Sequence, residues 1–329
     1  MRIRLALLHL FLCAFALVAK AQADFIGHVD SIINEHYSKS AMKHDTEYVV
    51  KPKQKWTIKL RANVSGTDLY AAGGINGKEF SSKMRTELKT TFGASVNYCG
   101  LSLGFALNPA KLTGRNKDYE FNLNSYGNRM GADLIITSSK TFRGKAESGG
   151  NEFDISPGQV SMSMIQGNVY YAFNHRRFSF PAAFSQSQVQ KRSCGSWLLG
   201  LSAFGGQIDA GIDGIGEGTS VSLKTLCIGL GAGYGHNFAI RKNWLLHLST
   251  IPQIVVYAKS RMTVGGKRQQ APFKFPSIYS VGRFAVVRRF GNKFIGLSAV
   301  VNLWRQGDDD RLLLESVKWR GRLFYGFKF

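Results

Sequence analysis

The last residues of the chain, Lys318 to Phe329 (KWRGRLFYGFKF), decide the fold class. The odd-numbered positions carry Trp, Gly, Leu, Tyr and Phe, whereas Lys318, Arg320, Arg322 and Lys328 lie between them. Successive side chains of a β-strand point to opposite faces, so this pattern predicts a strand with one face in an apolar medium. Aromatic residues near both ends of the strand are typical of a membrane interface.

The same period of two recurs through the chain from Trp56 onward. We predict strands at 56–64, 84–98, 100–109, 118–127, 130–143, 159–172, 188–205, 218–236, 243–258, 275–290, 292–305 and 313–329. Each is long enough for a tilted strand to cross a bilayer, which takes about 9–11 residues. Long, glycine-rich connections alternate with short ones, which a soluble β-sandwich would not predict. The expected fold is all-β: a single antiparallel transmembrane β-barrel of about 12 strands over residues 56–329.

The residues before the barrel carry an export pattern. A basic start, an apolar stretch from Leu5 to Val18 and Ala19-Lys20-Ala21 predict a signal peptide over residues 1–21. Apolar residues at helical spacing then predict a short amphipathic helix at 24–37, within a periplasmic helix and lead-in over 22–55. The expected location is the outer membrane, after signal-peptide-dependent export.

Three segments resemble one known family. They are Lys117–Leu134 (KDYEFNLNSYGNRMGADL), Tyr171–Gly200 and the opening Asp45–Val49 followed by Trp56. They are similar to an uncharacterised Bacteroidota outer-membrane group, catalogued as domain of unknown function four-four-two-one. The resemblance runs from about residue 44 to the C-terminus. It implies an outer-membrane barrel, no established activity and no functional residues to carry over.

The charge balance favours anionic partners. The chain has 43 Lys and Arg against 21 Asp and Glu, a net charge of +22. The basic residues are spread over alternating segments rather than clustered beside a nucleic-acid-binding motif, so we expect no nucleic-acid partner. The expected partners are outer-membrane lipid and lipopolysaccharide, the barrel assembly machinery and small anionic solutes.

A set of basic residues is expected to face the interior. By alternation it contains Lys59, Arg61, Arg85, Lys89, Lys318, Arg320 and Arg322. Rings of basic side chains favour anions in a pore. Glu87, Glu120 and Glu315 could instead neutralise this charge through internal pairs. The sequence leaves three functions open: a small channel or gated pore with a basic lumen, a closed structural or surface-interaction barrel, and, third, a lipid-modifying enzyme.

One connection on the short side is unusually long. The segment from Phe173 to Arg192 combines basic, aromatic, Ser and Gln residues. Two interpretations are open: an internal turn that folds into the lumen and narrows or gates it, and an ordered turn that caps the barrel mouth, which we favour. The residues concerned are Arg176, Arg177, Phe178, Phe180, Phe184, Lys191 and Arg192.

Two further patterns concern packing and assembly. Gly229, Gly231, Gly233 and Gly235 share the predicted inner face, where missing side chains leave room for a bulky neighbour or for strand curvature. Tyr325, Phe327 and the terminal Phe329 resemble the signal that the barrel assembly machinery reads.

No pattern indicates catalysis, a metal site or a cofactor. The sequence has no HExxH motif, and Gly100-Leu101-Ser102-Leu103-Gly104, which fits the letters of GxSxG, lies within a predicted strand and makes no nucleophile elbow. Asp308-Asp309-Asp310 fits a solvated turn better than a cation site. His247 shares a face with Ser249, as in barrel lipases and deacylases, but that face is expected to point inward. We therefore expect a protein that is not an enzyme.

Overall fold

The computed structural model describes residues 44–329 apart from 76–77, 99–100, 113, 115–117, 212–219, 242, 271–274 and 309–311. The expected signal peptide at 1–21 and the expected helix at 24–37 lie outside the described residues. Within those residues the chain is all-β, with two short helices, α2 (Pro109–Leu112) and α3 (Phe180–Phe184).

The strands follow the expected segments, each of which overlaps at least one of them. They are β1 (Val49–Val50), β2 (Trp56–Ile75), β3 (Lys78–Arg85), β4 (Lys89–Tyr98), β5 (Leu101–Leu107), β6 (Tyr119–Tyr126), β7 (Met130–Ser139), β8 (Arg143–Ser148), β9 (Asn151–Ile155), β10 (Val160–Ala172), β11 (Val189–Gln190), β12 (Cys194–Gly211), β13 (Ser220–Ile240), β14 (Trp244–Val264), β15 (Lys267–Gln270), β16 (Ile278–Phe290), β17 (Lys293–Asp308) and β18 (Leu312–Lys328).

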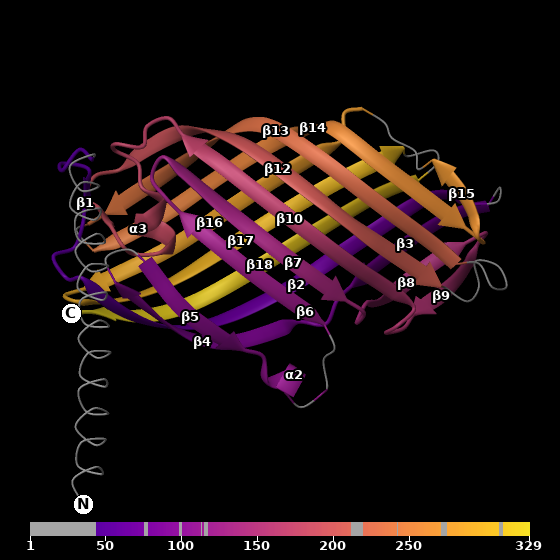
Figure 1. Cartoon of the computed structure of the whole chain (residues 1–329), viewed down its shortest axis with the longest axis horizontal. Helices are drawn as coiled ribbons and strands as arrows, with labels where there is room; N and C mark the ends of the chain where they lie inside the picture. Colours follow the sequence, from indigo (N-terminus) through magenta and orange to yellow (C-terminus); the bar gives the residue numbers. More distant parts are fainter. Residues whose placement is uncertain are drawn as a thin grey trace, which may run out of the picture.

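The main sheet is antiparallel and curls (Figure 1). Its hydrogen-bonded path runs β6-β7-β10-β12-β13-β14-β16-β17-β18-β2-β3-β8-β9, with β4, β5 and β15 attached beside it. Chain neighbours are mostly sheet neighbours, and the last long strand, β18, pairs with the first, β2. Only residues 140–142 separate β7 from β8, so the two end regions of the path are one continuous piece of chain.

A buried carboxylate holds the junction where β4 meets β7 and β8. Asp118 accepts hydrogen bonds from the backbone N–H of Lys140 and from the hydroxyl of Thr141, both at 2.7 Å. The Lys89 ammonium lies 3.6 Å from the same carboxylate. These contacts join three segments that are far apart in the sequence.

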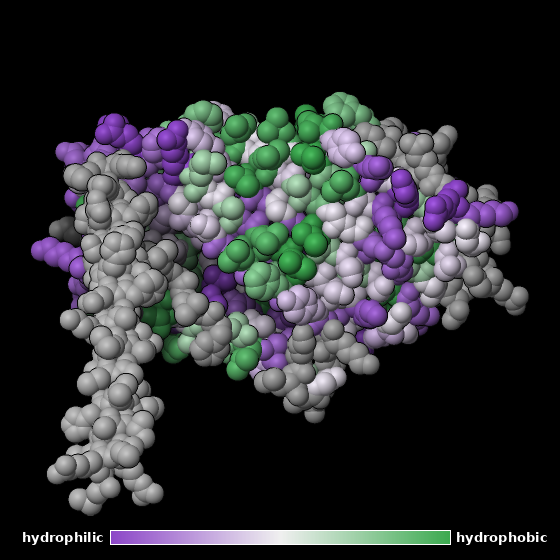
Figure 2. Space-filling model, in the orientation of Figure 1, coloured by the Kyte–Doolittle hydropathy of each residue, from purple (hydrophilic) through white to green (hydrophobic). Residues whose placement is uncertain are grey.

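The outward face of the strands is apolar. On β13, Leu226, Leu230 and Tyr234 are exposed, whereas Cys227 between them is fully buried. Apolar side chains gather over the middle of the strands in Figure 2, with hydrophilic residues toward the ends. Two stacked sheets would bury these side chains against each other, so the exposed face excludes a β-sandwich core built from them.

The inward face is filled in three layers. The loop-end cluster (the apolar cluster around Phe204, Tyr279 and Trp304) lies toward the end of the molecule that carries β9 and β15. The plug cluster (the apolar cluster around Phe178, Phe180 and Phe184) lies toward the other end, which we call the turn end. Along β10, β14 and β16, buried polar residues separate the two clusters. This polar layer comprises Asp133, Gln166, Asn168, Ser202, Gln253, Arg283 and Asn302.

The strands extend beyond the expected boundaries. β2 runs to Ile75, where we expected a loop from residue 70, and residues 143–155 form β8 and β9 in place of a loop. In these parts the inward face carries apolar residues such as Leu69, Ala71 and Ala146, whereas the outward face carries polar residues such as Lys145 and Glu147, so the apolar outward face that marks the other strands is missing. The pairing continues through backbone hydrogen bonds, which do not depend on an apolar outward face.

One expected inward residue points outward. Met84 and Thr86 are buried, while the Arg85 side chain is 80% exposed and lies 3.7 Å from Asp68. β3 and β4 both pair with β2, and between them the three residues 86–88 lie opposite only Gly66 and Thr67, so one extra residue changes which positions face inward. Lys89, beyond the break, is buried as expected, whereas Arg85 is removed from the set of interior basic residues.

Candidate functional site

The turn end is occupied by residues 173–192, which we call the plug segment. Its sequence favours a short helical turn: the hydroxyl of Ser179 accepts a hydrogen bond from the Ala182 N–H at 3.1 Å, and Pro181 stands in the first turn. All five residues of α3 are buried. Figure 1 places α3 inside the curled sheet, next to β1 and near the C-terminus.

Aromatic side chains of the plug segment surround one buried histidine. The ring centroids of Phe180 and Phe184 each lie 5.1 Å from that of His247, and that of Phe178 lies 5.9 Å away. Phe180 also packs on Tyr170, with 4.3 Å between centroids. The expected turn residues Phe178, Phe180 and Phe184 therefore form an apolar core inside the sheet.

Hydrogen bonds tie this core to the wall. His247 contacts Asn237 at 2.7 Å through Nδ1 and Ser249 at 3.0 Å through Nε2. Asn237 Nδ2 in turn donates to the Ser179 carbonyl at 2.8 Å and to Gln190 Oε1 at 2.9 Å. Asn237 and His247 are fully buried, so this serine, histidine and amide set fixes the plug segment to β13 and β14.

The lead-in segment (residues 44–55) clamps the plug segment from outside. β1 pairs with β11, Asp45 binds Arg177 at 2.9 Å and Glu47 binds Arg192 at 2.8 Å. The Tyr48 ring receives both guanidinium groups, Arg177 at 5.0 Å and Arg192 at 5.9 Å. Arg176, Arg177, Lys191 and Arg192 are all exposed, unlike the aromatic residues between them.

His44 of the lead-in segment also contacts the plug segment, through Gln188. Its ring nitrogens lie 3.2 Å from Asn128 Nδ2 and 3.3 Å from Gln188 Nε2. Burial, then the charges of Lys51 and His175, lower the pKa of His44.

This shift predicts a loss of stability in mild acid. Below about pH 6.5 the unfolded chain binds a proton at His44 more readily than the folded chain. The contribution of the neutral His44 to the free energy of unfolding is therefore lost as the pH falls from about 6.5 toward the lowered pKa. Between about pH 7.5 and pH 5, we expect the free energy of unfolding measured in urea to fall more for the wild type than for His44→Gln. An equal fall in the free energy of unfolding for the two proteins would show that His44 is not the cause of the acid sensitivity.

The polar layer contains a charge pair across the interior. Arg283 Nη2 lies 2.6 Å from Asp133 Oδ2, and both side chains are at most 3% exposed. Their strands, β16 and β7, are not neighbours in the sheet. The Arg283 guanidinium also lies 5.4 Å from the Tyr170 ring and 5.9 Å from the Phe180 ring, so it connects the polar layer to the plug cluster.

The remaining expected interior bases divide into two groups. Lys89 and Lys318 share Glu120, and Lys89 also contacts Asp118. Lys59, Arg61, Arg320 and Arg322 lie on the adjacent strands β2 and β18 and make no ion pair within the described part of the chain. Three of them bind neutral partners: Lys59 contacts Gln186, Arg320 contacts Asn124 and Arg322 contacts Asn63.

The glycine stripe lies on the inner face of β13 and has two kinds of neighbour. A Cβ atom on Gly231 or Gly233 would fall about 2 Å from the backbone oxygen of Pro252 or Thr250 on β14. At Gly235 the nearby atoms include the Phe178 ring of the plug segment at 3.1 Å, and at Gly229 they belong to Gln253 and the Ile254 carbonyl. The stripe thus permits close approach of β14, and Gly235 also makes room for the plug.

The expected assembly residues lie on the outward face. Tyr325, Phe327 and Phe329 are all exposed. Phe329 exchanges backbone hydrogen bonds with Trp56 at 3.1 Å and stacks on its ring at 6.4 Å.

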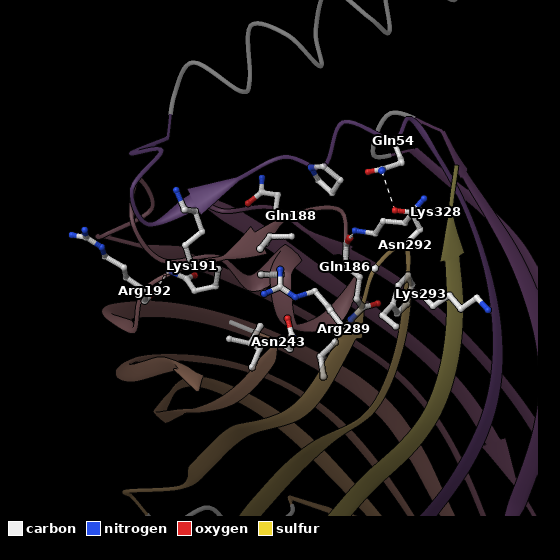
Figure 3. Close-up of a pocket in the computed structure, with 18 of the residues that line it drawn as sticks. Gln54, Gln186, Gln188, Lys191, Arg192, Asn243, Arg289, Asn292, Lys293 and Lys328 are labelled. Atoms are coloured by element: carbon white, nitrogen blue, oxygen red, sulfur yellow. Dashed lines mark hydrogen bonds between the residues drawn. The ribbon is translucent and has the colours of Figure 1, made fainter. Parts of the chain in front are cut away.

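A cavity of about 860 Å³ opens at the turn end (Figure 3), and we call it the mouth pocket. The lead-in segment, the plug segment and the turns after β13 and β16 line it. Lys191, Arg192, Arg289, Lys293 and Lys328 contribute basic groups, and Glu47 contributes a carboxylate. Among the described residues, no cluster could hold a metal ion and no helix is long and apolar enough to cross a membrane.

Sequence reasoning missed several parts of this site. Asp45 and Glu47 form the acidic half of the clamp, and their charge complements the basic ends of the plug segment, which is a usable signal. No sequence pattern near Asp133 or Arg283 predicts that they pair. The same holds for the pocket-lining residues Arg289, Asn243 and Asn292.

One protein family matches most of the chain. The family described as Domain of unknown function (DUF4421) matches residues 43–329. No curated protein matches the sequence. Among solved structures, the outer membrane protease OmpT from Escherichia coli is similar at 9% identity and a TM-score of 0.43, covering 87% of this chain and 100% of that one.

Two further solved structures are similar at lower scores. The Pseudomonas putida toluene transporter TodX has 8% identity and a TM-score of 0.26, covering 84% of this chain and 91% of that one. The outer membrane protein OprG from Pseudomonas aeruginosa has 9% identity and a TM-score of 0.28, covering 84% and 97%.

Proposed function

The chain belongs to the DUF4421 family, and from that premise we propose that it is a closed, non-conducting outer-membrane β-barrel whose own side chains fill the lumen. The exposed apolar face of the strands supports the membrane location, since monomeric soluble proteins rarely expose apolar patches this extensive. The first barrel strand begins and the last one ends at the turn end, which corresponds to the periplasmic side in such barrels.

The contacts across the interior carry the proposal of a filled lumen. In the polar layer, Arg283 of β16 binds Asp133 of β7, and Asn168 of β10 contacts Asn302 of β17 at 3.3 Å. In the loop-end cluster, Phe204 of β12 packs on Trp304 of β17 with 4.9 Å between centroids. None of these strand pairs is adjacent in the sheet, so the side chains meet where an open pore would hold water.

Conductance tests this proposal. The purified protein in planar bilayers is expected to show no discrete conductance. Deletion of residues 176–187 is expected to leave it silent, because the loop-end cluster still blocks the interior. The same deletion combined with Phe204→Ala, Trp304→Ala, Asp133→Ala and Arg283→Ala opens both apolar clusters and the polar layer between them, and we expect channels to appear.

Heat-modifiable migration on gels provides the control that each variant is folded. Discrete conductance of the wild type would contradict a filled lumen. Channels in the plug deletion alone would instead support a gated pore, our second candidate. That candidate is favoured by one observation: Lys59, Arg61, Arg320 and Arg322 face the interior beside the plug segment and would select anions once it moved.

The proposal assigns no catalytic role. The hydrogen-bonded Asn237, His247 and Ser249 have the residue types of a nucleophile relay, but His247 is enclosed by three plug phenylalanines. In this proposal they anchor the plug segment. Outer-membrane lipid and lipopolysaccharide would surround the apolar face, and the barrel assembly machinery would read the last strand.

A further inference from the structure

The mouth pocket is a large cavity, lined by described residues, that the proposal of a filled barrel does not use. Its volume of about 860 Å³ falls within the roughly 300–1,000 Å³ of small-molecule sites. It opens at the turn end and its floor is the plug segment, so a ligand could enter without passing through the lumen.

Two of its basic residues belong to the wall. Arg192 is held by Glu47 at 2.8 Å, and Lys191 donates to the Thr46 carbonyl at 3.0 Å. Glu47, the carboxylate of the lining, is therefore already engaged. Arg289, Lys293 and Lys328 line the cavity as well, and Figure 3 shows the Arg289 guanidinium near the centre of the group of lining residues.

The floor around these cations is built and buried. Lys328 is 7% exposed and donates to the Gln186 carbonyl at 2.6 Å, and Gln186 itself is 3% exposed. No carboxylate among the described residues forms an ion pair with Lys328. Arg289 lies near enough to repel it, and Lys59, which donates to the Gln186 side chain at 3.3 Å, adds a further positive charge nearby. An anion placed between Arg289 and Lys328 would relieve this repulsion.

Neutral donors complete the lining. Asn243 and Asn292 come from the two tight turns at the rim, and Gln54 donates to Asn292 at 3.2 Å. Amide groups of this kind orient the uncharged part of a ligand, whereas charge-assisted bonds to the two cations supply affinity.

We propose that the mouth pocket binds a small ligand with at least two oxyanion groups, held by Arg289 and Lys328. Phosphate and carboxylate groups share the required chemistry. The binding site adds to the proposed filled barrel and does not depend on whether the lumen conducts.

Calorimetric titration of the full chain in detergent micelles tests this inference. The probes are pyrophosphate and citrate, with sucrose as a neutral control of similar size. We expect saturable binding of at least one anion, no binding of sucrose and weaker binding as salt concentration rises. Arg289→Gln and Lys328→Gln are each expected to weaken binding by about ten-fold or more.

Arg288→Gln is the matched control. Arg288 is the neighbouring residue on β16, but it is exposed and stacks on Trp244 at 5.3 Å instead of lining the pocket. Binding of pyrophosphate alone would identify a phosphate site, and binding of citrate alone a carboxylate site. The inference would be overturned if neither anion binds, or if the Arg289→Gln and Arg288→Gln variants bind the anion with equal affinity. This holds whatever the bilayer experiment shows. Arg289→Gln also serves if Lys328→Gln does not fold.

Discussion

Arg283→Met is expected to lower the free energy of unfolding by about 3–5 kcal/mol, because it leaves the Asp133 carboxylate buried without its cation. Both side chains are almost completely enclosed, so water cannot replace the lost partner. The substitution also removes the guanidinium that packs on Tyr170 and Phe180. Urea unfolding in detergent micelles, followed by tryptophan fluorescence, measures the change.

Two variants make this result specific. Asp133→Leu combined with Arg283→Met removes both charges, and we expect it to recover most of the loss, because an apolar pair needs no compensation. Arg288→Met on the exposed side of the same strand is expected to change stability by less than about 1 kcal/mol. A loss in the double variant equal to that in Arg283→Met would show that the unpaired carboxylate is not the cause.

Phe180→Ala is expected to cost about 3–5 kcal/mol, as a large aromatic side chain is removed from a closed core. Phe180 is fully buried and touches Tyr170, Phe178, Phe184 and His247. The cavity would lie at the centre of the plug cluster, where the wall strands cannot collapse into it.

Phe173→Ala in the same segment is the matched control. Phe173 is 60% exposed and contacts Tyr171 at 5.2 Å, so its loss is expected to cost less than about 1 kcal/mol. Limited proteolysis provides a second measurement, in which Phe180→Ala alone should make the plug segment accessible. Equal stability of the two variants would mean that the plug segment does not pack as the structure has it.

Hydrophobic alternation predicted the inward and outward faces of strands whose outward face is apolar. On β13 and β18 the outward residues were assigned correctly, since Leu226, Leu230, Leu323 and Tyr325 are exposed. The method failed at Arg85, because one extra residue opposite β2 changed the face without disturbing the local pattern. It also ended strands too early where the outward face is polar.

The interior was predicted only in part. The aromatic content and unusual position of residues 173–192 indicated an internal turn, and this segment does form a buried core. Its partners could not be predicted, because they depend on how the sheet curls. Asp133 and Arg283 are separated by 150 positions, and Asp45 and Arg177 by 132. No local pattern connects residues at such distances.

The pairing of β18 with β2 runs from Leu312 against Gly73 to Lys328 against Thr57 and joins the last long strand to the first long strand. The lead-in segment and the plug segment precede β12 to β18 in the chain, and the buried residues of the plug segment pack against side chains of those strands. The order of construction follows from this arrangement. In the barrel that we propose, β18 and β2 form the closing pair, so we expect the plug segment to pack before these two strands meet during assembly.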